Sequence, residues 1–197
     1  MRKLPIALAL ALFMGFTADA GWAQNAEPKV KVLTSPEDAT KKTVLVGRAP
    51  AGGMVVTFEL EPAKAMLMQM GAPGSWMPHP PAKDEIFHVE VKPVDPRSKT
   101  RISYAEVEFN AVNRTNNQKI KLTLHPMWGG SGLHYAANSG LAGDGIYTAT
   151  ITVGVPAFTR DVKDKDVWMK PASARFHFKL TGGKLTEVSQ PADDAQK

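Results

Sequence analysis

The feature that most constrains the fold is a succession of short segments in which apolar and polar residues alternate. Seven such segments are rich in β-branched or aromatic residues and are bounded by Gly, Pro, Asn or Asp, which is typical of half-buried β-strands. They cover residues 44–46, 54–60, 86–91, 101–109, 118–125, 147–153 and 175–180. No long segment has helical periodicity. The pattern predicts an all-β fold, specifically an immunoglobulin-like antiparallel β-sandwich.

The N-terminus has the layout of a secretory signal peptide. Arg2 and Lys3 precede an uncharged run of 15 residues, from 4 to 18, and small residues follow at Ala18 and Ala20. The run is shorter than the ~20 residues that span a bilayer. We therefore expect residues 1–20 to be removed, with cleavage after residue 20 or 23, and the mature protein to be exported and soluble.

The rest of the chain is long enough for one domain with its own core. We expect that domain to cover residues 42–182 and residues 183–197 to form a flexible C-terminal tail. The chain has no cysteine, so an exported domain of this kind depends on packing or on a metal for its stability. Three long connections, at 62–81, 128–145 and 156–171, are the places where binding groups usually lie.

The charge pattern argues against nucleic acid as a partner. The formal net charge is +5, and the basic residues are scattered rather than gathered into a stripe with interleaved aromatics. An enzymatic role is also not expected. The sequence contains no Gly-x-Ser-x-Gly, no His-Glu-x-x-His, no phosphate-binding loop and no cysteine nucleophile.

One candidate pair of ligands lies on the segment at 86–91. Strand alternation puts Phe87, Val89 and Val91 on one face and His88 with Glu90 on the other. Neighbours two residues apart on one face can offer an imidazole nitrogen and a carboxylate oxygen to a single ion. A solvated outer face has the same pattern, and the pair alone does not decide between the two.

A second candidate pair follows the strand that ends near His125. Glycines between Met127 and His134 allow the chain to fold back, so that the thioether and the imidazole can face each other. Such a pair suits copper, and imidazole also suits iron. The alternatives are that Met127 fills a gap in the core and that His134 is a hydrogen-bond donor in a loop.

Methionine is concentrated in one place. The chain has nine methionines, of which four lie between positions 66 and 77. The spacing Met66-x-Met68-x-Met70 puts three thioethers on one face of an extended segment, as a Cu(I) platform or as ordinary core packing. With His79, these residues define an alternative function, that of a periplasmic copper-resistance carrier. A structural or adhesive sandwich without a metal function is a third possibility.

A series of short motifs occurs in a fixed order between about Gly52 and Leu180. They are Gly52-Gly53-Met54, His88-Val89-Glu90, Pro126-Met127, Gly132-Leu133-His134-Tyr135, Gly143-Asp144-Gly145-Ile146-Tyr147, and Arg160, Trp168 and Pro171. The most specific part is Pro-Met followed after six residues by His-Tyr and then by Gly-Asp-Gly. In order and spacing, these motifs resemble those of the periplasmic iron-transport P19/Tp34 family.

This resemblance implies a periplasmic, homodimeric sandwich that binds copper and assists high-affinity iron uptake beside an inner-membrane iron permease. It implies metal ligation by His88, Glu90, Met127 and His134. The family has a further histidine after an arginine in the late loop, where this chain has Asp161 after Arg160. An oxygen ligand at Asp161 would shift the preference from Cu(I) toward Cu(II), iron or manganese. The alternative is that Asp161 does not ligate and that the copper site is three- or four-coordinate and weaker. The expected function is therefore capture of a copper or iron ion, followed by transfer of iron to the permease.

Overall fold

A computed structural model describes residues 27–190 of the chain and gives twelve strands and one short 3-10 helix in that range. The all-β fold predicted from the sequence is confirmed. The strands are β1 (Val30–Glu37), β2 (Val44–Ala51), β3 (Met54–Pro62), β4 (Met66–Gln69), β5 (Trp76–His79), β6 (Phe87–Val94), β7 (Val107–Asn113), β8 (Lys119–Gly129), β9 (Gly132–Ser139), β10 (Gly145–Val153), β11 (Ala172–Thr181) and β12 (Lys184–Ser189), and the 3-10 helix η1 covers Val162–Asp164.

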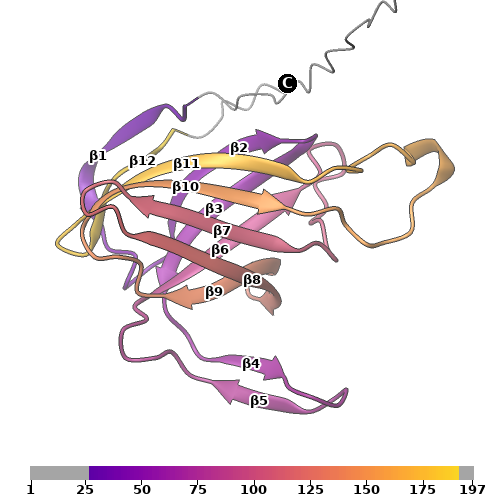
Figure 1. Cartoon of the computed structure of the whole chain (residues 1–197), viewed down its shortest axis with the longest axis horizontal. Coiled ribbons are helices and arrows are strands. Elements are labelled where there is room, and N and C mark those ends of the chain that lie inside the picture. The colour runs from indigo at the N-terminus through magenta and orange to yellow at the C-terminus, as the bar shows by residue number, and fades with distance from the viewer. Residues whose placement is uncertain (1–26, 191–197) are drawn as a thin grey trace, which may run out of the picture.

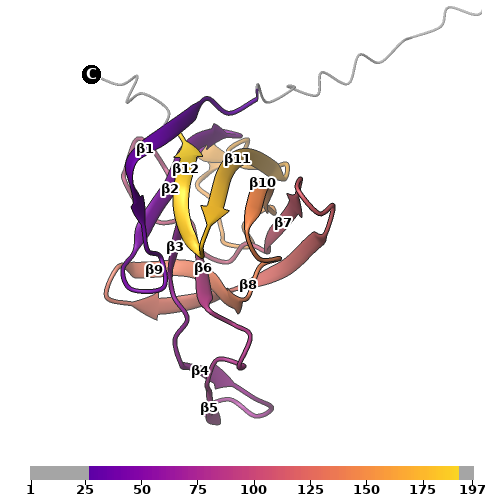
Figure 2. The same cartoon turned by 90° about the vertical axis from the view of Figure 1, so that its left-hand side faces the viewer.

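Ten of these strands form one antiparallel sheet that folds back on itself as two layers (Figures 1 and 2). The strand order is β1-β12-β11-β10-β7-β8-β9-β6-β3-β2. Strand β8 joins the layers, because its residues Lys119–Leu124 pair with β7 whereas His125–Gly129 pair with β9. At the far end, β2 comes back against β11 and β12, and a Cβ on Gly47 would lie 2.8 Å from the Cβ of Ser189. The sheet is therefore nearly closed around its core.

Aromatic side chains from both layers meet in that core. The ring of Phe58 on β3 lies 5.5 Å from those of Phe109 on β7 and Phe176 on β11, and 5.8 Å from that of Phe178. These are favourable distances for aromatic pairs. Since the inward positions of β3 and β6 supply the core, the alternate residues of the same strands lie on the outer face of their layer.

The structure extends the domain beyond the range 42–182 expected from the sequence. Residues 183–197 were expected to be a flexible tail, but Lys184–Ser189 form β12, with Leu185 fully buried. Strand β12 also pairs with β1. The sequences of β1 and β12 are short and polar, so the alternation of apolar and polar residues in them is weak. They form strands because they pair with each other. The predicted signal peptide, residues 1–20, lies outside the described residues, in which no helix is long and apolar enough to cross a membrane.

Two of the predicted long connections contain strands. Residues 128–145 include all of β9, and residues 62–81 include the β4–β5 hairpin. Glycine and asparagine made the first segment resemble a loop, but β9 lies between β8 and β6 and is hydrogen-bonded to both. Only the connection at 156–171 lacks strands, and it is organised by the guanidinium of Arg160, which donates to the carbonyl oxygens of Val167 and Pro156.

A buried amide holds the turn that precedes β10. The Nδ2 of Asn113 lies 3.0 Å from the carbonyl oxygens of both Ala142 and Asp144, and its Oδ1 accepts from the backbone N–H of Thr115 at 2.9 Å. Asn113→Ala is expected to lower the free energy of unfolding by about 2–3 kcal/mol, because it leaves buried backbone groups without partners. Urea denaturation measures this. The control Asn116→Ala, which loses an exposed bond to the same Ala142 carbonyl, should cost less than about 1 kcal/mol; equal losses would contradict the argument.

Candidate metal centre

Strand register brings His88, Glu90 and His134 together on the outer face of one layer. In β6, Phe87, Val89 and Val91 are buried in the core, so His88 and Glu90 lie on the opposite face. Strand β9 pairs with β6 so that Glu90 faces Ala136 and His88 faces Asn138. His134, two residues before Ala136, lies on the same face. Although this face is directed away from the core, the exposed fractions of His88, Glu90 and His134 are only 0%, 3% and 1%.

The two imidazoles are held through their Nδ1 atoms. The Nδ1 of His88 lies 2.8 Å from the Oδ1 of Asn138, whose amide nitrogen donates to the carbonyl oxygen of Lys64. The Nδ1 of His134 lies 2.8 Å from the carbonyl oxygen of Gly132. Because both partners are acceptors, each Nδ1 carries the proton and each Nε2 presents a lone pair. This is how histidine ligands are usually oriented in metal sites.

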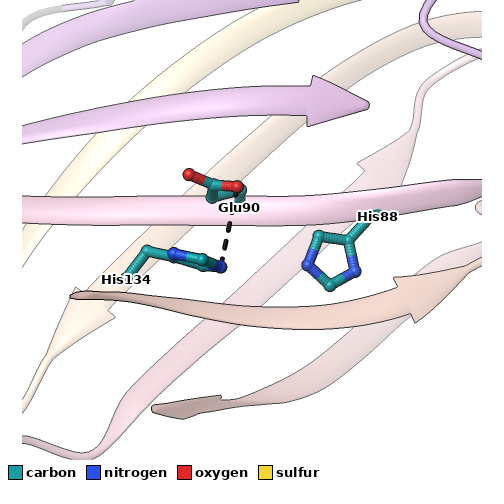
Figure 3. Close-up of side chains that lie close together, drawn as sticks. All are labelled: His88, Glu90 and His134. Carbon is teal, nitrogen blue, oxygen red and sulfur yellow. Dashed lines mark ion pairs between the residues drawn. The ribbon is translucent and has the colours of Figure 1, made fainter. Parts of the chain in front are cut away.

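Both Nε2 atoms point into the cluster and lack a hydrogen-bond partner among residues 27–190. The Nε2 of His134 lies 3.7 Å from the Oε2 of Glu90, which is too long for a hydrogen bond (Figure 3). The three residues offer ligand atoms within 4.8 Å of one another, and the two rings are nearly perpendicular, with centroids 6.3 Å apart. Buried polar atoms are rarely left unpaired. Their convergence on one point fits a cation between them.

Glu90 is fixed by partners on its other oxygen. Its Oε1 accepts a hydrogen bond from the hydroxyl of Ser131 at 2.8 Å and lies 2.6 Å from the Nζ of Lys92. Burial by itself raises the pKa of Glu90, but hydrogen bonds with Glu61, Lys92 and Ser131 outweigh this effect and lower the pKa to about 2. The carboxylate is therefore ionised at neutral pH, with Oε2 directed toward His134.

The histidines are neutral at the same pH. Burial is the largest cause that lowers the pKa of His88 and the pKa of His134, and it outweighs the hydrogen bonds with Asn138 and Gly132 that raise them. No proton has to leave either Nε2 before a cation binds. The donor set that the three side chains offer is therefore two imidazole nitrogens and one carboxylate oxygen.

Glu61 is a further acidic group beside the centre that the sequence analysis did not single out. In the register of β3 and β6 it faces His88, and its Oε1 lies 3.9 Å from the Nε2 of that residue. Burial and a hydrogen bond with Glu90 raise the pKa of Glu61, against the opposing effect of its ion pair with Lys64. Of these two neighbouring carboxyl groups, Glu61 is therefore the one with a raised pKa and Glu90 the one with a lowered pKa.

The other two predicted ligands have different positions. Met127 on β8 is directly opposite His134 in the β8–β9 register, so the two side chains share a face, and Met127 is half-buried. Asp161 does not belong to the cluster of ligand atoms found in residues 27–190. It is exposed, and its carboxylate accepts from the backbone N–H of Lys163 as the N-cap of η1. The structure therefore gathers the ligand atoms of three of the five predicted residues, His88, Glu90 and His134, and the register puts Met127 opposite His134.

Several supporting residues were missed because their positions depend on register. Glu59 and Glu61 alternate with buried Phe58 and Leu60, a signal of the same kind as that at His88 and Glu90, but sequence does not show which strand lies beside them. Gly129 lies against the His134 ring, since a Cβ there would be 3.1 Å from Cε1 of the imidazole. The remaining missed positions are Lys64, Lys92, Ser131 and Asn138.

Fold and centre together define an antiparallel β-sandwich with a buried histidine–carboxylate cluster on the outer face of one layer. Residues 77–182, more than half of the chain, match the sequence model of the family described as Fe2+ transport protein. The chain belongs to this family, which confirms the resemblance described above.

Solved structures agree with this fold assignment. FetP of uropathogenic Escherichia coli strain F11 is 22% identical, with a TM-score of 0.56 over 71% of this chain and 97% of that chain. A copper-bound variant of Campylobacter jejuni P19 is 21% identical, with a TM-score of 0.56 over the same shares of the two chains. Copper-reconstituted P19 also matches, with 21% identity and a TM-score of 0.55 over 71% of this chain and 96% of that one. No match was found among curated protein sequences.

Proposed function

We propose that this protein is a non-enzymatic periplasmic carrier that captures copper or iron at the His88–Glu90–His134 centre and assists high-affinity iron uptake. The observation that carries the proposal is the pair of buried Nε2 atoms that face Glu90 without hydrogen-bond partners in the described chain. Membership of an iron-transport family supports the iron function. The copper-bound structures of P19 and FetP support copper as a ligand of the same fold.

The donor atoms suit a borderline transition-metal ion. Imidazole binds copper and iron, carboxylate adds a hard oxygen donor, and the thioether of Met127 adds a soft donor beside His134. Hard cations such as Ca²⁺ and Mg²⁺ prefer sites in which all ligands are oxygens. The centre therefore favours Cu(II) and Fe(II) over hard divalent ions such as Ca²⁺ and Mg²⁺.

Charges around the centre also suit a carrier, which must release its cargo. The ammonium groups of Lys92 and Lys64 are paired with Glu90 and Glu61 at the edge of the site. Both lysines repel positive charge at His134, where they lower the imidazole pKa. The same repulsion lowers the affinity of the centre for a cation. Glu90 therefore binds the ion, and the two lysines limit how tightly it is bound.

We further propose that the carrier is a homodimer and that it transfers iron to an inner-membrane permease. Family membership and the sequence resemblance support both statements. Asp161 lies outside the cluster within one chain, so a ligand role for Asp161 requires the second copy of the homodimer. The predicted signal peptide supports a periplasmic location.

The test is metal-dependent stabilisation of metal-free protein. A ligand that binds the native state raises the melting temperature, so one equivalent of Cu(II), or of Fe(II) without oxygen, should raise it. Glu90→Gln should weaken binding at least tenfold. Glu187→Gln is the matched control, because Glu187 faces His177 at 3.3 Å and Lys179 at 3.2 Å on the other layer. No thermal shift in the unmutated protein, or equal affinities in Glu90→Gln and the control, would contradict the proposal.

A further inference from the structure

The β4–β5 hairpin stands apart from the rest of the molecule. It forms its own two-stranded sheet, and both views show it projecting from the nearly closed main sheet (Figures 1 and 2). At its base, the N–H of Ala63 donates to the carbonyl oxygen of Ile86, and Asn138 bonds to the backbone of Lys64. A two-stranded hairpin without a core beneath it is marginally stable in water. We therefore looked for a role of its side chains other than stabilising the fold.

Register gathers the sulfur atoms of the hairpin on one face. Met66 faces His79 and Met68 faces Met77 across the two strands. Paired residues in an antiparallel ladder share a face, with Cβ atoms about 4.5–5.5 Å apart. Met70 follows in the same alternation, and its N–H donates to the carbonyl oxygen of Ser75 at 3.0 Å. One face therefore carries the methionines and an imidazole, while Leu67, Gln69, Trp76 and Pro78 occupy the other.

Core packing does not account for these methionines. Within the part of the chain that the structure describes, the hairpin methionines belong neither to the buried core nor to the side chains packed against it. Met70 and Met77 are 53% and 55% exposed. Methionine is valued in cores because it fills irregular gaps, and an exposed hairpin has no such gap. Contiguous exposed apolar side chains usually mark a binding function.

We propose that the methionine face of the hairpin binds a soft monovalent ion, Cu(I), through the thioethers of Met66, Met68 and Met77 and the imidazole of His79. Thioethers are neutral, polarisable donors that select Cu(I) over harder ions. They have no proton to lose, so three of the four ligands are insensitive to pH. The hairpin is thus a second metal site that differs from the buried centre in donor softness, exposure and position.

The experiment uses the full mature chain labelled with ¹³C at the methionine methyl groups, titrated with Ag(I) as a redox-inert probe for Cu(I). The His134→Ala background weakens the buried centre. We expect the methyl signals of Met66, Met68 and Met77 to shift with one equivalent of Ag(I), while those of buried Met54 and of Met169, which is 55% exposed, stay in place. Uniform shifts of exposed methionines, or no shift in the hairpin, would overturn the proposal.

A variant separates the site from general thioether affinity. The triple variant Met66→Leu/Met68→Leu/Met77→Leu keeps apolar side chains of similar volume. It should weaken Ag(I) and Cu(I) binding at least a hundredfold. When His134 is present, the same triple variant should retain Cu(II) binding at the buried centre. Met169→Leu is the control and should bind as before. Unchanged Cu(I) affinity in the triple variant, measured by competition with a chromogenic chelator, would refute the hairpin site without affecting the buried centre.

Discussion

Replacing His134 by alanine is expected to lower the affinity for Cu(II) or Fe(II) about a hundredfold or more. The variant removes one of the two nitrogens that converge on the centre and leaves Glu90 Oε2 without its neighbour at 3.7 Å. Loss of groups that merely orient ligands already costs about 10–100-fold in metal affinity, so loss of a ligand should cost at least as much. Isothermal titration of metal-free protein measures the difference.

The control for this experiment is His177→Ala. His177 also faces a carboxylate, Glu187, at 3.3 Å, but it lies on the other layer and outside the cluster. The His177→Ala variant should bind Cu(II) or Fe(II) with the affinity of the unmutated protein in the same titration. If His134→Ala binds metal as the unmutated protein does, the assignment of the centre is wrong, whereas equal losses in both variants would indicate a general effect on the fold.

Lys92→Met is expected to change stability and metal affinity in opposite directions. The Lys92 ammonium is buried between Glu59 and Glu90, with side-chain exposures of 9%, 16% and 3%. Removing one partner of a buried ionic group costs about 3–5 kcal/mol, because it leaves uncompensated charge. Chemical denaturation of the metal-free variant should show this loss. Added Cu(II) should recover part of it, since the cation neutralises Glu90 and no longer meets the repulsion of Lys92.

Lys121→Met is the matched control for that experiment. Lys121 pairs with Glu108 at 3.3 Å, but both side chains are exposed, and such surface pairs contribute about 0–1 kcal/mol. If the free energy of unfolding of Lys92→Met lies within about 1 kcal/mol of that of the unmutated protein, the buried ion pairs of Lys92 do not stabilise the fold. If Lys92→Met binds Cu(II) more weakly than the unmutated protein, Lys92 does not oppose the cation.

Alternation along single strands made part of this structure predictable. The period of two places His88 and Glu90 on the face opposite Phe87 and Val89, and the structure has them there. Met127 and His134 were expected to face each other, and the β8–β9 register pairs them. These inferences succeed because neighbours two residues apart on one strand, or on either side of a tight turn, are positioned locally.

The residues that surround the ligands were not predictable in this way. Glu61 lies beside His88, and Asn138 lies on its other side, only because β3 and β9 flank β6. A shift of one residue in either register would turn these side chains to the other face, and no single strand encodes its neighbour. The same reason explains why β9 and β12 were not predicted as strands. Their glycine, asparagine and charged residues weaken the local strand pattern, and these segments become strands by pairing with their neighbours. The sequence also could not show that the carboxylate of Asp161 caps η1, because η1 is only three residues long and has no helical periodicity.

Asn138 ties the root of the projecting hairpin to the orientation of one imidazole. Its Oδ1 lies 2.8 Å from the Nδ1 of His88, and its Nδ2 donates to the carbonyl oxygen of Lys64 at 2.9 Å. The same side chain therefore couples the backbone at Lys64 to the tautomer of His88, because one amide group can accept from the imidazole and donate to the carbonyl oxygen at once.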